Sequence, residues 1–337
     1  MKHILLYAIL LLCCTLAAAQ RIDGRDWMSQ LDDAHTVASL SIPGAHDAAT
    51  GEGMIMVAGF GKTQELTLDE LWNSGVRAFD LRPAVKGKEL HIYHGPIRTK
   101  ASFQEALEAL CNKLEEHPSE FAVVLLREES DSENTTERAL WPSVVGKAIE
   151  AIGDKAALFS AAMSVGDARG KIIFLSRNTY TGCNKGAKIS GWSHSPEGNT
   201  NVRISSYANG ATARLMVQDY YAPTDKDKQQ TKERAVLHYL QLAAEAPADV
   251  WTINFASGYR NCWLGFTPFA TTSGYKRNAQ AINPIIIEAL DAKPQPTGIM
   301  MLDFAGCDKT SGGIWHWSNF GTLGAEVVDK IIRQNFK

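Results

Sequence analysis

Short apolar runs alternate with amphipathic stretches along most of the chain. Runs rich in β-branched and aromatic residues are typical of buried strands, and they occupy residues 37–42, 76–81, 89–93, 121–126, 171–175, 214–217, 249–255 and 298–303. Between several runs, apolar residues recur every three or four positions, as in SFQEALEALCNKLEEH, SVVGKAIEAIG and KERAVLHYLQLAAEA, and this spacing predicts helices. The pattern therefore predicts an α/β protein.

Continuous apolar strands that alternate with helices favour a parallel sheet covered on both faces. Eight such units predict a single distorted (β/α)8 TIM-type barrel, with an active site at its C-terminal mouth. The link from residue 81 to residue 89 is too short for a crossover helix, so we expect a hairpin or an irregular unit there. Residues 200–213 and 257–280 are expected to be loops.

The first 20 residues differ from the rest of the chain. Lys2 and His3 precede the apolar run ILLYAILLLCCTLAAAQ, which ends in small residues and is typical of a secretory signal peptide. We therefore expect residues 1–20 to be a signal peptide, residues 21–337 to form the barrel, and the protein to be secreted or periplasmic. A lipoprotein acylated at Cys13 or Cys14 is disfavoured, because the small residue expected before such a cysteine is missing.

Composition narrows the function only slightly. The 337 residues are 45% hydrophobic and 21% charged, with a net charge of -3, which is ordinary for a globular protein and gives no case for nucleic-acid binding. The cysteines outside the signal peptide have no zinc-site spacing, and an exported protein could pair them; they are Cys111, Cys183, Cys262 and Cys307. A disulfide between Cys262 and Cys307 is one hypothesis, because both follow predicted strands.

Charged or titratable side chains follow seven of the eight predicted strands. In a closed barrel the C-terminal ends of the strands meet at one mouth, whereas solvated loops would scatter polar residues at both ends. The pattern therefore predicts an active site built from these residues: His46, Asp47, Asp80, Arg82, His94, Arg127, Glu129, Arg177, Asp219, Tyr221 and Asp303.

Two histidines beside an arginine suit acid–base cleavage of a phosphodiester. One histidine can accept a proton from the nucleophile while the other donates one to the leaving group. Asp47 and Asp303 are candidates to orient them, and Arg82 offers a planar fork to phosphate oxygens. Histidine and aspartate also bind metals, but an arginine at the centre of the mouth would repel a divalent cation. The chain has no serine elbow and no P-loop motif.

Several motifs together resemble one enzyme family. SIPGAHD, FDLRP and HIYHGP resemble the X-domain signature of bacterial phosphatidylinositol-specific phospholipase C, and GDARGKIIFLSR, VQDYY, TINFASG and MLDF follow in the family's order. The resemblance covers about residues 28–335. It implies a secreted 1-phosphatidylinositol phosphodiesterase, a diacylglycerol-lyase that needs no cofactor. Its products would be diacylglycerol and inositol 1,2-cyclic phosphate.

The resemblance also implies catalytic roles. His46 would be the general base for the inositol 2-hydroxyl, oriented by Asp303. His94 would be the general acid for the diacylglycerol oxygen, paired with Asp47. Arg82 would hold the phosphate, with Asp80 nearby. Calcium-dependent relatives carry an acidic residue in place of this arginine, so its presence supports a mechanism without a metal.

The inositol pocket follows from the same resemblance. Its expected residues are Arg127, Glu129, Arg177, Trp192, Asp219 and Tyr221. In the stretch GWSHSPEG, Trp192 is retained, but His194 stands near the place where Bacillus-type enzymes have a carboxylate. This departure leaves the headgroup preference open between phosphatidylinositol, a GPI-type anchor and another inositol lipid.

Two segments that are expected to be exposed, residues 51–61 and 257–280, carry large apolar residues. They could pack under a loop, or form a rim that inserts into a membrane surface. The family has lipid-contacting residues in both segments, which favours a rim made of Met54, Ile55, Met56, Phe60, Trp263, Phe266 and Phe269. We therefore expect a monomer that binds membrane surfaces transiently.

Two further functions stay open from the sequence. A metal-dependent glycerophosphodiesterase would share the barrel and the two histidines but would need Ca²⁺ or Mg²⁺. An inositol-lipid binding module would bind without turnover, and the intact set of His46, His94 and Arg82 argues against it.

Overall fold

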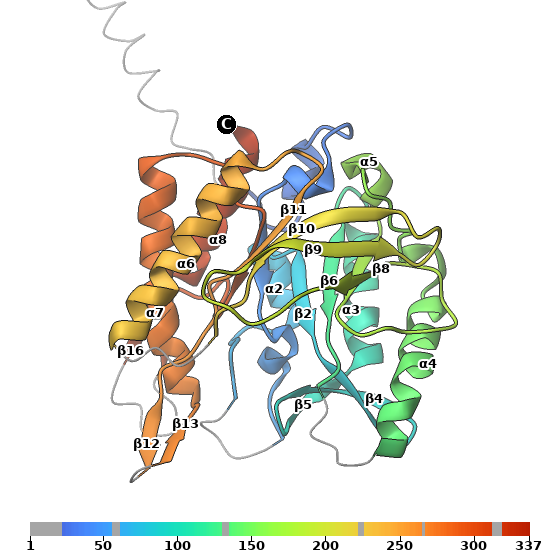
Figure 1. The fold of residues 1–337 in the computed structure, drawn as a ribbon, viewed down its shortest axis with the longest axis horizontal. Coiled ribbons are helices and arrows are strands. Elements are labelled where there is room, and N and C mark those ends of the chain that lie inside the picture. The colour runs from blue at the N-terminus through green and yellow to red at the C-terminus, as the bar shows by residue number, and fades with distance from the viewer. Residues whose placement is uncertain (1–21, 56–60, 130–134, 222–225, 265–266, 312–318) are drawn as a thin grey trace, which may run out of the picture.

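A closed barrel surrounded by helices forms the centre of the molecule (Figure 1). The computed structural model of the chain describes residues 22–55, 61–129, 135–221, 226–264, 267–311 and 319–337, without the side chains of 226–227, 262–264 and 267–269. Within these ranges, each helix is too short or too polar to cross a membrane.

Nine strands close the barrel in the order β1-β14-β11-β10-β9-β8-β7-β6-β2. Neighbouring strands run parallel except at β9, which is antiparallel to both β8 and β10. The strands are β1 (Ile42–Ala45), β2 (Ala78–Leu81), β6 (Ala122–Leu126), β7 (Ile172–Ser176), β8 (Ala187–Ser190), β9 (Asn199–Ser206), β10 (Thr212–Gln218), β11 (Trp251–Phe255) and β14 (Ile299–Leu302). The predicted distorted barrel is confirmed, but the predicted count of eight strands is wrong.

The short link after residue 81 does produce an irregular unit. The run 89–93 becomes β4 (Glu89–His94), which forms a separate antiparallel sheet with β3 (Pro83–Lys86) and β5 (Ile97–Ser102). Its predicted place in the barrel is therefore wrong. Strands β8 and β9 complete the wall instead. The sequence predicts a loop over much of β9, because most of its residues are polar, unlike the continuous apolar runs of parallel strands. In the structure only some residues of β9 are buried.

The first strand begins later than its apolar run suggests. Residues Val37–Ser39 form a 3-10 turn, η2, and β1 passes through Pro43 and Gly44 instead of ending there. A Cβ atom at Gly44 would lie 2.4 Å from the sulfur of Met301 on the neighbouring strand β14. The glycine therefore allows close contact between two strands that carry site residues.

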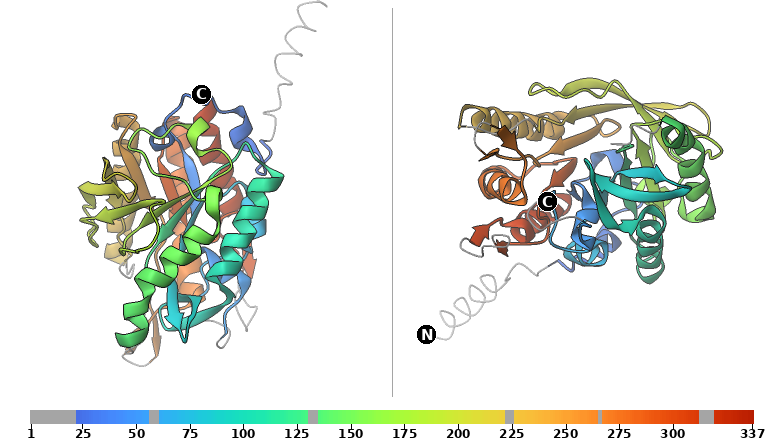
Figure 2. Two further views of the ribbon diagram at one scale, coloured as in Figure 1. Left: turned by 90° about the vertical axis from the view of Figure 1, so that its right-hand side faces the viewer. Right: turned by 90° about the horizontal axis from the view of Figure 1, so that it is seen from below.

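Helices cover both sides of the barrel (Figure 2). The three predicted helices are confirmed as α3 (Phe103–Glu116), α4 (Thr135–Ala151) and α6 (Lys226–Glu245). The predicted loop 257–280 instead contains the hairpin β12 (Cys262–Leu264) and β13 (Thr267–Phe269) and the start of α7. The other elements are α2 (Leu68–Ser74), α5 (Val165–Ala168), α7 (Thr272–Ala292), α8 (Gly324–Arg333), β15 (Lys309–Ser311), β16 (Asn319–Gly321), η1 (Trp27–Gln30), η3 (Ala48–Glu52), η4 (Gly153–Lys155) and η5 (Gln334–Phe336).

Among the described residues, one large apolar cluster and two smaller ones make up the core. All five residues of β6, of β7 and of β11 are buried, as expected for parallel strands covered on both faces. Cys307 carries a free thiol, as do Cys111 and Cys183. The hypothesis of a disulfide between Cys262 and Cys307 is therefore wrong.

Candidate active site

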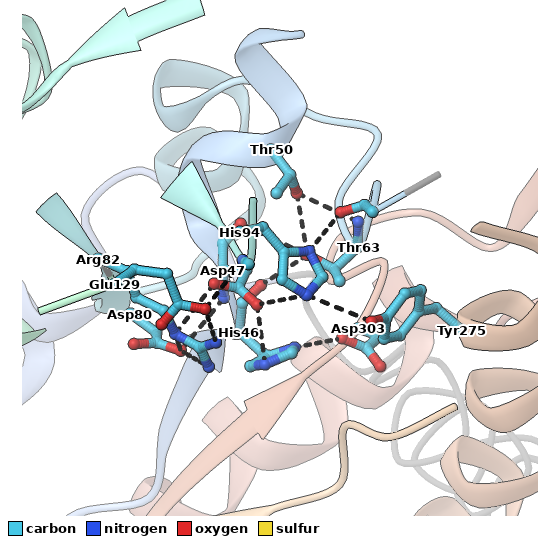
Figure 3. A network of polar contacts seen from close by, with 12 residues as sticks. His46, Asp47, Thr50, Thr63, Asp80, Arg82, His94, Glu129, Tyr275 and Asp303 are labelled. Atoms are coloured by element: carbon cyan, nitrogen blue, oxygen red, sulfur yellow. Dashed lines mark hydrogen bonds and ion pairs between the residues drawn. The ribbon is translucent and has the colours of Figure 1, made fainter. Parts of the chain in front are cut away.

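The site forms where the parallel strands end. His46 and Asp47 follow β1, Arg82 follows β2 and Asp303 follows β14. His94 ends β4 and reaches the same place from outside the barrel, where its ring centroid lies 6.1 Å from that of His46. Figure 3 shows Asp47 at the centre, with Arg82 and its partners on one side and Asp303 with Tyr275 on the other.

Both ring nitrogens of His46 face carboxylates. Nδ1 lies 2.8 Å from Oδ1 of Asp303, and Nε2 lies 3.0 Å from Oδ2 of Asp47. Burial by itself would lower the pKa of His46, but Asp47 and Asp303 outweigh it and raise the pKa to about 8. This arrangement favours a protonated imidazole that donates a hydrogen bond to Asp303 and forms an ion pair with Asp47.

The turn that carries His46 is held by a buried polar network. The side chains of Thr63 and Gln64 donate to the carbonyl of His46 at 3.1 and 2.8 Å, and Gln64 also donates to the carbonyl of Leu302. Asp47 has a left-handed backbone, with φ of 45°, which is unusual for a residue other than glycine. Such backbone strain persists only where the surroundings enforce it, and it is frequent at functional sites.

Asp47 lies between the two histidines. Its Oδ2 is 3.0 Å from Nε2 of His46 and 3.4 Å from Nε2 of His94, and its Oδ1 is 3.0 Å from Nε of Arg82. Burial raises the pKa of Asp47 in spite of these cations. The family resemblance pairs this carboxylate with His94 alone, whereas in the structure it contacts both rings.

His94 is oriented by a backbone carbonyl. Its Nδ1 lies 2.5 Å from the carbonyl oxygen of Gly61, to which it can only donate. Its Nε2 is therefore the atom that gains or loses a proton, and it faces both Asp47 and the hydroxyl of Tyr275, 3.2 Å away. The sequence does not reveal Tyr275 as a site residue, because its position in α7 falls within a predicted loop.

Arg82 is fixed by three carboxylates. Its Nη2 lies 2.8 Å from Asp80 and its Nε 3.0 Å from Asp47, while its Nη1 is 3.6 Å from Glu129. Burial would lower the pKa of Arg82, but these carboxylates raise it above its usual value. In turn, Arg82 lowers the pKa of Asp80 against the effect of burial. The guanidinium is therefore a permanent, positioned cation.

The same residues include a possible set of metal ligands. Ligand atoms of His46, Asp47 and Asp80 lie within 4.8 Å of one another, the one such group found among the described residues. However, Arg82 contacts both carboxylates of this set at 3.0 and 2.8 Å. A divalent cation there would have to displace or repel that guanidinium.

The expected inositol-pocket residues form a second group beside the histidines. Asp219 follows β10 and accepts a hydrogen bond from the indole of Trp192 at 3.0 Å, and it lies 3.4 Å from Nη1 of Arg177. The Arg177 guanidinium also lies 4.4 Å above the Trp192 ring. Arg127 lies 3.4 Å from Glu129, which also contacts Arg82 and so connects the two groups.

Tyr221 and His194 lie at the outer edge of this group. The Tyr221 side chain is 48% exposed, and its ring centroid lies 4.4 Å from that of His194. The backbone N–H of Tyr221 donates to Nε2 of His194 at 3.3 Å. The histidine that stands near the place of the family's carboxylate therefore contacts an aromatic ring.

The structure places only part of the predicted rim. Ile55 is 54% exposed and Met54 is half-buried. Met56, Phe60 and Phe266 lie outside the described residues, and Trp263 and Phe269 are described by backbone alone, in the β12–β13 hairpin. Figure 1 shows this hairpin at the same end of the molecule as β4 and β5.

A buried lysine behind the site is a further residue that the sequence does not reveal. Lys232 of α6 is fully buried, and its ammonium donates to the carbonyls of Tyr220, at 2.7 Å, and Phe255. It thereby joins the ends of β10 and β11, next to Asp219. Burial lowers the pKa of Lys232 to about 7. One feature of the sequence could have indicated that Lys232 is buried. It lies four residues before Val236 and therefore on the apolar face of the helix.

The charge of His46 gives a first prediction. We expect NMR titration of the unliganded protein to give His46 a midpoint of about 8. Replacing Asp303 by asparagine removes one carboxylate that favours the charged ring, so the midpoint should fall. A midpoint in the Asp303→Asn protein equal to that of the unmodified protein would contradict this assignment.

Comparisons with known proteins agree with the motifs. The scan of protein-family models found no match. The 1-phosphatidylinositol phosphodiesterase of Listeria monocytogenes is 27% identical over 288 residues, which are 83% of this chain and 81% of that protein. The protein of the same name from Staphylococcus aureus strain Newman is 25% identical over 90% of this chain and 93% of its own length.

A solved structure gives the same likeness at the level of the fold. It is the phosphatidylinositol-specific phospholipase C of S. aureus, studied for modulation of its membrane binding, and it superposes with a TM-score of 0.69 at 22% identity. The match covers 92% of this chain and 98% of that one. The predicted resemblance to bacterial phosphatidylinositol-specific phospholipase C is confirmed.

Proposed function

We propose that this protein is a phosphatidylinositol-specific phospholipase C that works without a metal ion. The observation that carries the proposal is the arrangement of His46 and His94 around Asp47, with Arg82 in an ion pair with the same carboxylate. Two proton carriers and a fixed cation at one barrel mouth are the groups that cleavage of a phosphodiester by an internal hydroxyl requires.

The first proton moves to His46. Its Nε2 accepts the proton of the inositol 2-hydroxyl while the oxygen attacks phosphorus, and Asp303 on Nδ1 stabilises the imidazolium that forms. Nε2 faces Asp47 in the structure, so the substrate hydroxyl must replace that contact. Loss of one of its two carboxylate contacts lowers the tendency of His46 to hold a proton before the reaction begins.

The second proton comes from His94. As the bond between phosphorus and the diacylglycerol oxygen breaks, Nε2 of His94 gives its proton to that oxygen. Nδ1 is occupied by the Gly61 carbonyl, and Asp47 stabilises the charged ring before the transfer. The products are diacylglycerol and inositol 1,2-cyclic phosphate, whose slow hydrolysis would use the two histidines in exchanged roles.

Arg82 supplies the positive charge that the phosphate needs. Its fork would bind the two non-bridging oxygens, and the carboxylates of Asp47, Asp80 and Glu129 hold the guanidinium in place. Arg127, Glu129, Arg177 and Asp219 would bind the ring hydroxyls, with Trp192 and Tyr221 against the apolar faces of the ring.

The test is turnover of phosphatidylinositol in the presence of EDTA, followed by phosphorus NMR. A signal of the cyclic phosphate is expected. Activity that disappears with chelation and returns with Ca²⁺ or Mg²⁺ would favour a metal-dependent glycerophosphodiesterase. Binding of phosphatidylinositol vesicles without any product would favour a non-catalytic lipid-binding protein.

Export and membrane contact complete the proposal. Residues 1–20 would be removed as a signal peptide, leaving a secreted or periplasmic monomer of residues 21–337 that binds membranes transiently. Intact mass and sedimentation measurements on the protein recovered from outside the cytoplasm test both points. A precursor mass that retains residues 1–20 would contradict processing.

The rim gives a prediction of its own. The Trp263→Ala, Phe266→Ala double variant should bind phosphatidylinositol vesicles about ten-fold more weakly or worse, since each apolar side chain buried in the interface contributes ~1–3 kcal/mol. Hydrolysis of soluble inositol cyclic phosphate should barely change. If both activities fall together, the two residues belong to the core instead. Leu237→Ala, an exposed apolar position on α6, provides the control.

A further inference from the structure

A buried glutamine lies between the two strand ends that carry His46 and Asp303. Gln64 is fully buried, and it belongs to the segment 61–65, which lies outside the helices and strands. A buried amide group costs free energy unless its atoms are hydrogen-bonded. The contacts of this amide therefore indicate what the folded protein gains from it.

The amide of Gln64 joins the end of β1 to the end of β14. Its Nε2 donates to the carbonyls of His46 and Leu302, both at 2.8 Å. Its Oε1 accepts the backbone N–H of Ala305 at 3.0 Å. Both polar atoms of the amide are used, and their partners are the main chain of His46 and the main chain on either side of Asp303. One side chain thus fixes the backbone of the histidine and of its carboxylate.

The segment that carries Gln64 is itself held on two sides. The backbone N–H groups of Thr63 and Gln64 donate to the hydroxyl of Thr50 on η3, at 3.2 and 3.1 Å (Figure 3 shows both threonines). On the β14 side, the N–H of Phe304 donates to the carbonyl of Thr63 at 2.7 Å. Phe304 has φ of 53°, and such strain persists only where the surroundings enforce it.

The contact between His46 and Asp303 depends on these main-chain positions. Nδ1 of His46 lies 2.8 Å from Oδ1 of Asp303, and Oδ2 of the same carboxylate accepts the N–H of Gly258 at 3.0 Å. Because Gly258 holds the carboxylate, it cannot simply follow a displaced ring. Besides Gln64, one backbone hydrogen bond joins the two strand ends, from the N–H of His46 to the carbonyl of Leu302 at 3.0 Å.

We propose that Gln64 is a positioning residue for the general base: it holds His46 against Asp303, so that Nε2 of the ring is directed at the substrate hydroxyl. The inference rests on the proposed function, because it assumes that His46 is the base. Gln64 touches no reacting atom and acts only through His46. Its loss should therefore impair the step that needs the base and leave the action of His94 intact.

The first test is kinetic and uses Gln64→Met, which keeps the length of the side chain and removes the amide. We expect kcat on monomeric short-chain phosphatidylinositol to fall about ten-fold or more, since misplacing a reacting group by about 1 Å can cost roughly 10²-fold. KM should change less than about three-fold. The loss should be equally large on a nitrophenyl inositol phosphate, because that reaction also needs the base although its leaving group needs no proton.

The second test is NMR titration of His46 in the protein without substrate. In Gln64→Met the midpoint should fall from about 8 toward the ordinary value of 6.5, because the ring is no longer held close to its carboxylates. A residue that only stabilises the fold would not move this midpoint in a protein that remains folded.

Gln334→Met is the matched control. Gln334 is 8% exposed, on η5, and its amide also bonds to main chain, accepting from Gln295 at 3.1 Å and donating to Lys330 at 2.6 Å. Its replacement should alter neither kcat nor the midpoint of His46. If Gln64→Met does not fold, Gln64→Asn replaces it: the amide is retained but cannot reach both carbonyls, so kcat and the midpoint should still fall.

The proposed function and the role of Gln64 fail in different ways. A lower kcat with an unchanged His46 midpoint, or a loss confined to the lipid, would overturn the positioning role, as would a variant that keeps both kcat and the midpoint. In these cases the function stands, because the unmodified protein cleaves phosphatidylinositol. If the unmodified protein cleaves neither substrate, the proposed function is wrong, while the titration still decides whether Gln64 holds His46 against Asp303.

Discussion

Replacing His46 by alanine is expected to lower kcat on phosphatidylinositol by about 10²–10⁴ or more, the range for a positioned proton carrier. The inositol 2-hydroxyl is a weak nucleophile until its proton is removed, and Nε2 of His46 lies at the strand end where Asp303 holds the ring from the other side. Among the described residues, no other histidine contacts the carboxylate of Asp303. The measurement is steady-state turnover on monomeric substrate, with the folded state checked by circular dichroism.

His238→Ala is the matched control for that experiment. This histidine is exposed on α6, away from the network around Asp47, so its removal should leave turnover unchanged. An active His46→Ala protein, with kcat within about three-fold of the unmodified protein, would remove the histidine from the base role, because a lost general base cannot have so small an effect.

His94→Ala should lower turnover of phosphatidylinositol by a similar factor, about 10²–10⁴ or more. The loss should depend on the leaving group. A diacylglycerol oxygen needs a proton as it departs, whereas an acidic leaving group such as a nitrophenolate departs as an anion. His94→Ala should therefore retain far more activity on a nitrophenyl inositol phosphate than on the lipid.

The same pair of substrates distinguishes the two histidines. His46→Ala should impair both reactions, because each needs a deprotonated 2-hydroxyl. If His94→Ala loses equal activity on both substrates, the ring does not act as the acid. Tyr275→Phe should have a smaller effect than either variant, because its hydroxyl contacts Nε2 of His94 without replacing the carbonyl that orients the ring.

Local patterns in the sequence are sufficient to find the strands that carry the chemistry. A fully buried parallel strand must be apolar throughout, so runs such as those at β6 and β7 are easy to recognise. The residue that follows a parallel barrel strand lies at the mouth, because the C-terminal ends of these strands meet there. For this reason the sequence alone predicts that His46, Arg82, Arg177 and Asp303 are neighbours.

Elements without such a pattern cannot be placed from the sequence. Strand β9 is largely polar because one of its faces is exposed, so its residues resemble a loop. The apolar residues of β4 suggest a barrel strand, yet β4 pairs with β3 and β5, because a link of a few residues can join antiparallel strands but not parallel ones. An apolar run shows that a strand is buried but does not show which neighbour it pairs with.

The partners of each site residue were decided by tertiary structure. His46 and Asp303 are 257 positions apart and meet only because β1 pairs with β14 when the barrel closes. The family motifs pair Asp47 with one histidine, but closure of the barrel puts it within reach of two rings and a guanidinium. Residue type and strand position are local properties, so the sequence determined the chemical groups at the mouth. Contacts depend on strand register and chain closure, so only the folded chain determined which groups share a proton or a charge.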